Sequence, residues 1–164
     1  MSTPGPGETL FAFVRHWSRR PWAGNDTVAE KGRLVLTTAA VDSLTRRGIA
    51  ATVNAVAGEI GIDQSGASRL ITTAREAGCL TMQAPETDGR RRQAAVTPSG
   101  RTLLEQARAW QEQVFDRLTE GWSDRQRRDF SEAMADLVER SYALDPAGAG
   151  RGSTGPATRR STGV

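Results

Sequence analysis

The fold is decided by residues 52–78, TVNAVAGEIGIDQSGASRLITTAREAG, which predict two short helices joined by a tight turn. In the first helix, apolar residues recur at helical spacing, at Val53, Val56, Ala57 and Ile60. Gly61 then ends this helix, because glycine readily adopts the left-handed conformation found at helix C-termini. Asp63 is a suitable N-cap for the second helix. The buried face of the second helix is expected to comprise Ala67, Leu70, Ile71 and Ala74.

The opposite face of the second helix is polar and suited to nucleic acid. Its members are Gln64, Ser65, Ser68, Arg69, Thr72 and Arg75. Each can form a hydrogen bond with a base edge or a phosphate, as a recognition helix in a major groove must. Any helical hairpin in a small domain also has one polar face, so polarity alone does not decide the matter. A merely solvated helix usually carries Glu and Lys, however, and here only Glu76 is acidic.

Residues 79–100, CLTMQAPETDGRRRQAAVTPSG, predict a β-hairpin followed by the start of a helix. Apolar and polar residues alternate on both sides of a turn signal at residues 87–89, as on half-buried strands. Asp88, Arg90, Arg91 and Arg92 lie at the tip of this hairpin. A hairpin with an arginine tip beside a helix-turn-helix is a wing, placed to contact the sugar–phosphate backbone or the minor groove.

The chain on either side of this wing completes the predicted unit. Thr97 is expected to cap the next helix, with Pro98 at its first position. Residues 49–51 are expected to form a short strand that pairs with the wing.

The order of these elements resembles the MarR family of bacterial winged-helix transcriptional regulators, best over residues 52 to about 104. The matching features are Thr52 at the first helix, Gly61 at the turn, residues 65–70, and Gly78 before the wing. Asp88-Gly89-Arg90 matches the Asp-x-Arg signature of the wing, and residues 96–100, VTPSG, match its exit. The departures are Cys79 for the usual leucine, Met82 and Gln83 where arginine is frequent, and Gly66 within the recognition helix.

The resemblance implies a mainly α fold with a small β-wing. The expected winged helix-turn-helix covers about residues 49–100, with dimerisation helices at about 8–20 and 98–145, all within a single domain at 8–145. Further amphipathic helices are predicted at residues 27–47 and from 123 to about 144, the latter opened by a Ser123–Gln126 capping box. Residues 1–7 and 146–164 lack apolar periodicity and are expected to be a disordered leader and tail.

The helices outside the predicted winged helix-turn-helix carry more apolar surface than such a domain needs. In the resembling family such helices build a homodimer, and a monomeric bundle is the alternative. The candidate interface residues are Leu10, Phe13, Trp17, Leu137, Val138 and Tyr142. Small aromatic compounds often bind beside these helices in the family, and the residues that would line such a pocket here are Phe11, Trp17, Trp22, Trp110 and Phe115.

The expected function is that of a sequence-specific transcriptional regulator, a repressor that binds a palindromic operator as a homodimer and is released by a small ligand. Its partners would be double-stranded DNA, a second copy of itself and a small aromatic ligand. A winged-helix protein-interaction module without DNA binding is the alternative, and it would show apolar residues on the exposed helix face.

Composition and charge narrow the classes of function that remain for this chain. Residues 52–100 hold five basic and five acidic groups, so the reading unit is not basic overall. No apolar run approaches the roughly 20 residues that a membrane span needs, no signal-peptide pattern is evident, and a cytoplasmic protein is expected. The one cysteine, Cys79, and the one histidine, His16, predict neither a catalytic pair nor a metal site. No cofactor is expected. Cys79 is expected to be a buried core thiol, with a redox sensor as the alternative.

Overall fold

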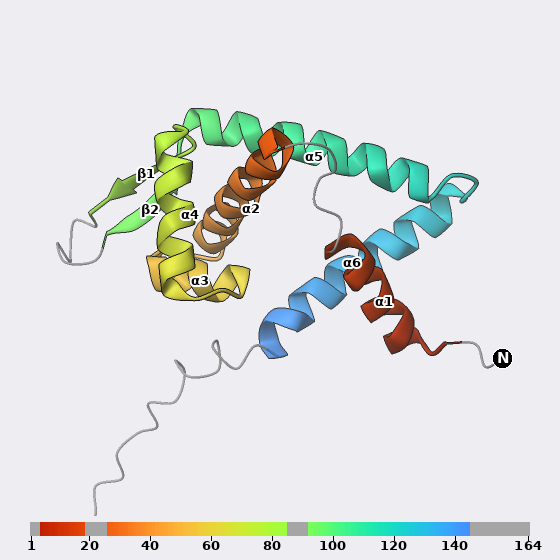
Figure 1. Cartoon of the computed structure of the whole chain (residues 1–164). Helices are drawn as coiled ribbons and strands as arrows, with labels where there is room; N and C mark the ends of the chain where they lie inside the picture. The colour runs from red at the N-terminus through yellow and green to blue at the C-terminus, as the bar shows by residue number, and fades with distance from the viewer. Residues whose placement is uncertain (1–3, 19–25, 85–91, 145–164) are drawn as a thin grey trace, which may run out of the picture. The chain divides into compact units, whose positions relative to one another are not determined.

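The computed structural model describes residues 4–18, 26–84 and 92–144. In chain order (Figure 1), its elements are α1 (Pro6–Ser18), α2 (Asp26–Arg46), α3 (Val53–Ile60), α4 (Gln64–Glu76), β1 (Leu80–Gln83), β2 (Gln93–Val96), α5 (Pro98–Leu118) and α6 (Asp124–Leu144). The chain divides after Glu112 into two compact units, and α5 continues from the first into the second. A mainly helical chain with a small wing is therefore confirmed.

The helix-turn-helix forms through the caps that the sequence predicts. The Thr52 side chain accepts a hydrogen bond from the Ala55 amide at 3.2 Å and opens α3. Gly61 ends α3 with φ of 78°, in the left-handed region. Asp63 then opens α4 by accepting a hydrogen bond from the Gly66 amide at 2.7 Å. Local hydrogen bonding thus sets both helix starts and the turn between them.

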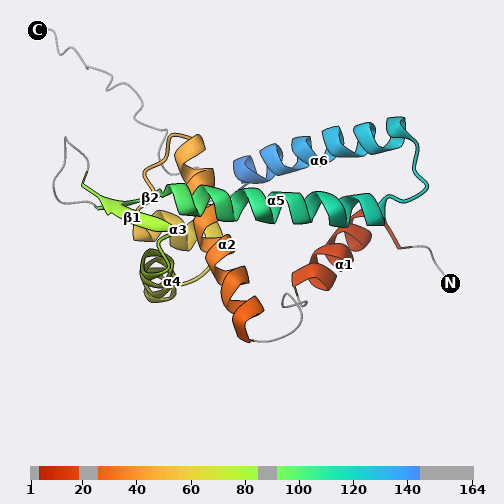
Figure 2. The same cartoon turned by 90° about the horizontal axis from the view of Figure 1, so that it is seen from above.

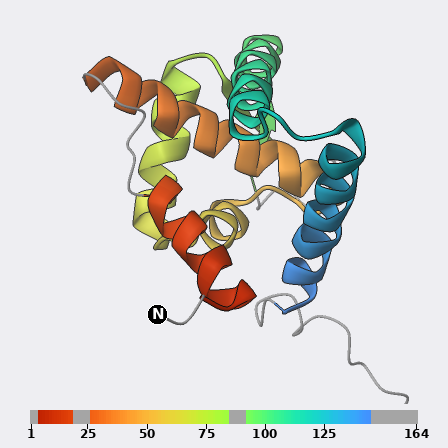
Figure 3. The ribbon, with the colours of Figure 1, turned by 90° about the vertical axis from the view of Figure 1, so that its right-hand side faces the viewer.

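The core of the first unit is built largely from small side chains. α2, α3 and α4 pack against one another (Figures 1 and 3), with both strands covering the same cluster. The buried members are Ala40, Val41, Leu44, Ala51, Val56, Ala57, Ala67, Ile71, Ala74, Leu80 and Ala94. Because alanine has no side chain beyond Cβ, the α4 backbone can approach its neighbours closely.

The wing is an antiparallel pair in which Leu80 faces Val96 and Gln83 faces Gln93. The expected strand at residues 49–51 does not form. The Ala94 amide does donate to the Ala51 carbonyl at 2.9 Å, but the Thr52 amide donates back to the Ala50 carbonyl at 2.8 Å. That turn bends the segment into α3, because Thr52 must cap a helix that starts at the next residue.

The start of α1 also differs from expectation. α1 begins at Pro6, so Pro6 and Gly7 belong to a helix and not to the predicted leader. Proline suits a first helical position, because its missing N–H would have no partner there. α5 ends at Leu118, and Gly121 follows in the left-handed region with φ of 82°.

A tight junction joins α4, the wing and α5, and β2 runs into the start of α5 beside it (Figure 2). The Thr97 hydroxyl donates to the Gly78 carbonyl at 2.5 Å and accepts from the Gly100 amide at 3.1 Å. The Thr97 amide donates to the Cys79 carbonyl at 3.1 Å. A Cβ atom at Gly100 would lie 2.2 Å from that same carbonyl oxygen. Only glycine fits without moving backbone.

The second unit contains its own small cluster. The Ser123 amide donates to Gln126 Oε1 at 2.9 Å, and the Gln126 amide donates to Ser123 Oγ at 3.3 Å, which confirms the predicted capping box. Asp116 forms an ion pair with Arg127 at 2.7 Å. Phe130 stacks on Phe115 and meets the edge of Trp122, with ring centroids 6.1 and 5.6 Å away respectively.

Gly100→Ala should destabilise the first unit. The added methyl group collides with backbone, and overpacking of this kind costs about 1–3 kcal/mol of unfolding free energy. The matched control is Gly58→Ala in α3, where a Cβ meets nothing within 4 Å and where helix propensity should add about 0.5–1 kcal/mol. Urea unfolding at one protein concentration measures both. Equal effects of the two substitutions would show that the junction is not tightly packed.

Candidate nucleic-acid interface

α4 presents two sharply different faces. Ala67, Ile71 and Ala74 are buried, whereas Leu70 is only half-buried, contrary to the fully buried position expected for it. The six predicted polar residues, Gln64, Ser65, Ser68, Arg69, Thr72 and Arg75, are all exposed. The structure therefore brings them together on one solvent-facing helix surface, which we call the α4 polar face.

The wing residues divide between described and undescribed parts of the chain. Arg92 is exposed at the start of the returning strand. Asp88, Arg90 and Arg91 lie outside the described residues, so their assignment to DNA stays a prediction.

The N-terminus of α4 is organised by the Asp63 carboxylate. It accepts a hydrogen bond from Ser65 Oγ at 2.6 Å as well as from the Gly66 amide at 2.7 Å. These two hydrogen bonds, with that from Ser65 first, lower the pKa of Asp63 below its ordinary value, and the positive charge of Arg69 acts in the same direction. Asp63 thus caps the helix as an anion at neutral pH.

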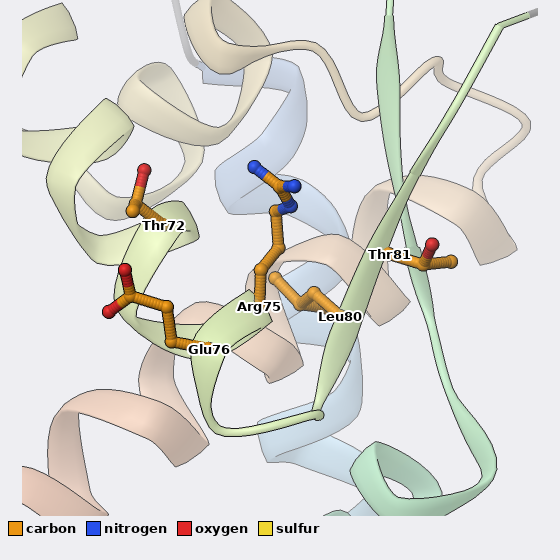
Figure 4. A pocket seen from close by; sticks show the side chains of 5 residues that line it. All are labelled: Thr72, Arg75, Glu76, Leu80 and Thr81. Atoms are coloured by element: carbon orange, nitrogen blue, oxygen red, sulfur yellow. The ribbon is translucent and has the colours of Figure 1, made fainter.

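A groove of about 390 Å³ separates the C-terminal half of α4 from β1. It is lined by Thr72, Arg75, Glu76, Leu80 and Thr81 (Figure 4). In Figure 4 the Arg75 side chain extends into the space between helix and strand, whereas the Glu76 carboxylate points away from it. The groove therefore offers the Arg75 cation, which suits an anionic partner such as phosphate.

Thr81 is a groove residue that the sequence reasoning missed. It is exposed, between the buried Leu80 and the half-buried Met82. The same strand alternation that identified Leu80 and Met82 places Thr81 on the other face, so the signal was present in the sequence.

The acidic residue of α3 is neutralised within the fold. Glu59 forms an ion pair with Arg47, which directly follows α2, and accepts a hydrogen bond from Ser43 Oγ of α2 at 2.9 Å. The Glu59 side chain is only 16% exposed. Its charge is therefore balanced by Arg47 and adds little repulsion toward a polyanion.

Cys79 lies in the core, as expected, with 7% of its surface exposed. Burial raises the pKa of the Cys79 thiol above its ordinary value. Because the thiolate is the form that oxidants attack, this environment disfavours the redox-sensor alternative.

The predicted dimer residues are exposed apolar side chains in each unit taken by itself. The exposed members are Leu10, Phe13, Leu137, Val138 and Tyr142. Trp17 is half-buried and packs near Phe13, with ring centroids 6.2 Å apart.

The predicted ligand-pocket residues are less uniform. Phe11 and Trp110 are exposed, and Trp22 lies outside the described residues. Phe115 is half-buried in the stack with Phe130 described above.

Among the described residues, no group of three or more His, Cys, Asp or Glu side chains is arranged to hold a metal ion. Within the same residues, every helix is too short or too polar to cross a membrane.

A helix-turn-helix, a two-stranded wing and long flanking helices together define a winged helix-turn-helix fold. No protein-family profile and no curated protein matches the sequence. Solved structures do match. MarR aligns with a TM-score of 0.62 and 21% identity, covering 88% of this chain and 96% of that chain.

Two further solved regulators show the same fold. BpsR from Bordetella bronchiseptica, whose DNA binding is regulated by 6-hydroxynicotinic acid, aligns with a TM-score of 0.52 and 21% identity, covering 80% of this chain and 97% of that one. CouR from Rhodococcus jostii RHA1, solved with bound p-coumaroyl-CoA, aligns with a TM-score of 0.56 and 20% identity, covering 83% and 95%. The chain therefore has the fold of the MarR-family regulators.

Asp63→Asn should remove an acid-sensitive part of the stability. Because the pKa of Asp63 is lowered from 3.8 in the folded state, its charge stabilises the fold above that pH, and this contribution is lost as the pH falls through the lowered pKa. Wild type should therefore exceed the variant in unfolding free energy at neutral pH, and this difference should shrink as the pH falls through the lowered pKa of Asp63. Urea unfolding across this range measures the difference. A gap that does not change with pH would contradict the assignment.

Proposed function

We propose that this chain is a sequence-specific DNA-binding transcriptional regulator, which acts in the cytoplasm as a homodimer on a twofold-symmetric operator. The observation that carries the proposal is the α4 polar face. Its six side chains are all exposed and all of a type that can form hydrogen bonds, while the opposite face of the same helix is held in the core. Repression, through occupancy of the operator, is the proposed mode of action.

The two arginines of the α4 polar face have different proposed roles. Arg69 is exposed on the face that would enter the major groove, where a guanidinium group pairs well with guanine O6 and N7. Arg75 lies in the groove against β1, where a backbone phosphate could approach both helix and strand. Arg92 lies farther along the wing and would extend the phosphate contacts.

A protein-interaction module is less well supported. Such a module would present large apolar side chains on the exposed surface of α4, as hot spots of protein interfaces do. The nearest one is Ile62 in the turn, which is 37% exposed. The α4 polar face itself contains none.

We also propose a binding protein rather than an enzyme. The chain has one cysteine and one histidine. Cys79 is buried, whereas His16 is exposed on α1 beside Trp17. A thiol–imidazole pair would need both in one site.

Homodimerisation is proposed to cover the exposed apolar residues of α1 and α6. Leu137 and Val138 are 47% and 49% exposed, and Leu10 and Phe13 are 39% and 49% exposed. Single exposed apolar residues are ordinary, but several on consecutive helical turns favour an interface. A twofold operator also suits a symmetric dimer, because each copy reads one half-site.

Release by a small ligand is the remaining part of the proposal. The aromatic residues of α1 and α5, including Phe11, Trp17 and Trp110, would contact the ring of a small aromatic compound. The DNA binding of BpsR is regulated by 6-hydroxynicotinic acid, and CouR was solved with bound p-coumaroyl-CoA. Such a ligand must prefer a conformer whose two recognition helices no longer match successive major grooves. By reciprocity, operator DNA must weaken ligand binding by the same factor.

Arginine substitutions separate base reading from phosphate binding. Arg69→Ala should weaken binding to the preferred sequence by about 1–3 kcal/mol and relax specificity, because a base contact is lost. Arg75→Ala should weaken binding to all duplexes similarly and reduce the salt slope by about 1. Fluorescence anisotropy at several salt concentrations measures both effects.

The control for these substitutions is Arg140→Ala on α6, which removes the same charge from an exposed pair with Asp136. It should leave binding nearly unchanged. Loss of affinity in all three variants alike would indicate a general charge effect and contradict specific reading.

A charge in the proposed interface should separate the copies. Leu137→Glu should shift the protein from dimer to monomer, because the new carboxylate would be buried without a partner. Leu36→Glu, at an equally exposed leucine of α2, should leave the dimer intact. Sedimentation at micromolar concentration measures both variants. A wild-type chain that sediments as a monomer there would contradict the homodimer.

A further inference from the structure

The hydroxyl groups of α4 differ in what they can still offer a ligand. Ser65 Oγ donates its hydrogen to Asp63 Oδ1 at 2.6 Å. Thr72 Oγ1 donates to the Ser68 carbonyl at 2.9 Å. A hydroxyl group has one hydrogen to donate, so Ser65 and Thr72 can accept further hydrogen bonds but cannot donate one without breaking these.

Ser68 provides the contrast within the same face. It is exposed, and its hydroxyl group forms no hydrogen bond with any residue that the structure describes. Its hydrogen is therefore available to a ligand. The α4 polar face thus combines an open donor at Ser68 with committed donors at Ser65 and Thr72.

Ser65 and Thr72 occupy the centre of the exposed surface. They are seven residues apart, which is close to two helical turns, so they lie almost in line along the helix and about 10 Å apart. The buried Ala67, Ile71 and Ala74 lie on the opposite side. In a major groove the two side chains would meet different base pairs.

The hydrogen bonds donated by Ser65 and Thr72 are strong enough to keep both hydroxyl hydrogens committed. The Ser65 bond is short and ends on a carboxylate, which is the stronger kind of hydrogen bond. The bond from Thr72 to the carbonyl four residues earlier is the usual helical arrangement for threonine. With the hydroxyl held against the helix, the methyl group of Thr72 remains as its apolar contact surface.

We propose that Thr72 is a specificity-determining residue that selects thymine through contact between its methyl group and the thymine C5-methyl group. Guanine presents only acceptors to the major groove, so a committed hydroxyl group has nothing to donate to it. Ser65, as an acceptor, fits the amino group of adenine or cytosine at a neighbouring pair. This inference rests on the proposed function, because it assumes that α4 enters the major groove.

The experiment uses the intact chain and a duplex recovered by repeated selection from random-sequence DNA. Each thymine of that duplex is replaced singly by uracil, which lacks only the methyl group. Wild-type protein should bind about four-fold more weakly at one thymine in each half-site, the factor expected for one buried methyl group. Other thymines should show no comparable change.

Two substitutions at Thr72 separate its methyl group from its hydroxyl group. Thr72→Val keeps a methyl group and should keep both the affinity and the uracil sensitivity. Thr72→Ser keeps the hydroxyl group, should bind about four-fold more weakly, and should no longer distinguish uracil from thymine. Thr73→Ser is the matched control, because Thr73 donates to the Arg69 carbonyl at 3.1 Å but is half-buried. It should leave binding unchanged.

The outcomes distinguish this inference from the function on which it rests. If selection recovers no preferred sequence, the proposed function is contradicted and the inference with it. If a preferred sequence emerges but Thr72→Val weakens binding as much as Thr72→Ser, the hydroxyl group is the reading group and the inference is wrong. The inference is also wrong if the protein still binds its preferred sequence but no replacement of a thymine by uracil weakens that binding. Thermal unfolding of each variant identifies losses due to folding.

Discussion

The structure depends on one close contact, that between the Gly78–Cys79 peptide and the start of α5. The hydrogen bonds of Thr97 to Gly78 and Cys79, and the absence of a side chain at Gly100, hold these backbones together. Because Gly78 follows α4 and Thr97 follows the wing, a single residue couples both to α5. Any tilt at the start of α5 must therefore move the end of α4 or break these bonds. A ligand that altered α5 would have a direct mechanical route to the proposed reading surface.

For the proposed DNA-binding role, the electrostatics of residues 52–100 favour selectivity over strong general attraction. Residues 52–100 are neutral by count, and the charge of the half-buried Glu59 is balanced by Arg47. Phosphate contacts supply most nonspecific affinity in DNA-binding proteins, and here few cations are available for them. Discrimination would then depend on the short side chains at the centre of α4, whose hydrogen-bonding state is set within the helix itself. This is consistent with a face built from hydroxyl groups rather than lysines.

Sequence reasoning succeeded where the signal is local and failed where it is not. The caps at Thr52, Asp63 and Ser123 follow from residue type and spacing, and the structure confirms them. The prediction of a strand at residues 49–51 was wrong. The hydrogen-bonded turn between Thr52 and Ala50 bends this segment, even though Ala51 accepts a hydrogen bond from Ala94. The approach of Gly100 to Cys79 joins distant positions, so no periodicity reveals it. The committed hydrogens of Ser65 and Thr72 depend on side-chain rotamers, and for that reason a sequence pattern shows the exposed face but not its donor capacity.

The central claim is that paired copies of α4 read DNA bases in two half-sites. Selection of bound fragments from random duplex DNA, followed by protection mapping, tests it most directly. The account predicts a twofold-symmetric consensus whose half-site centres lie about 10 base pairs, or one helical turn, apart. Recovery of no preferred sequence would contradict it. So would a single asymmetric site protected by one copy of the chain.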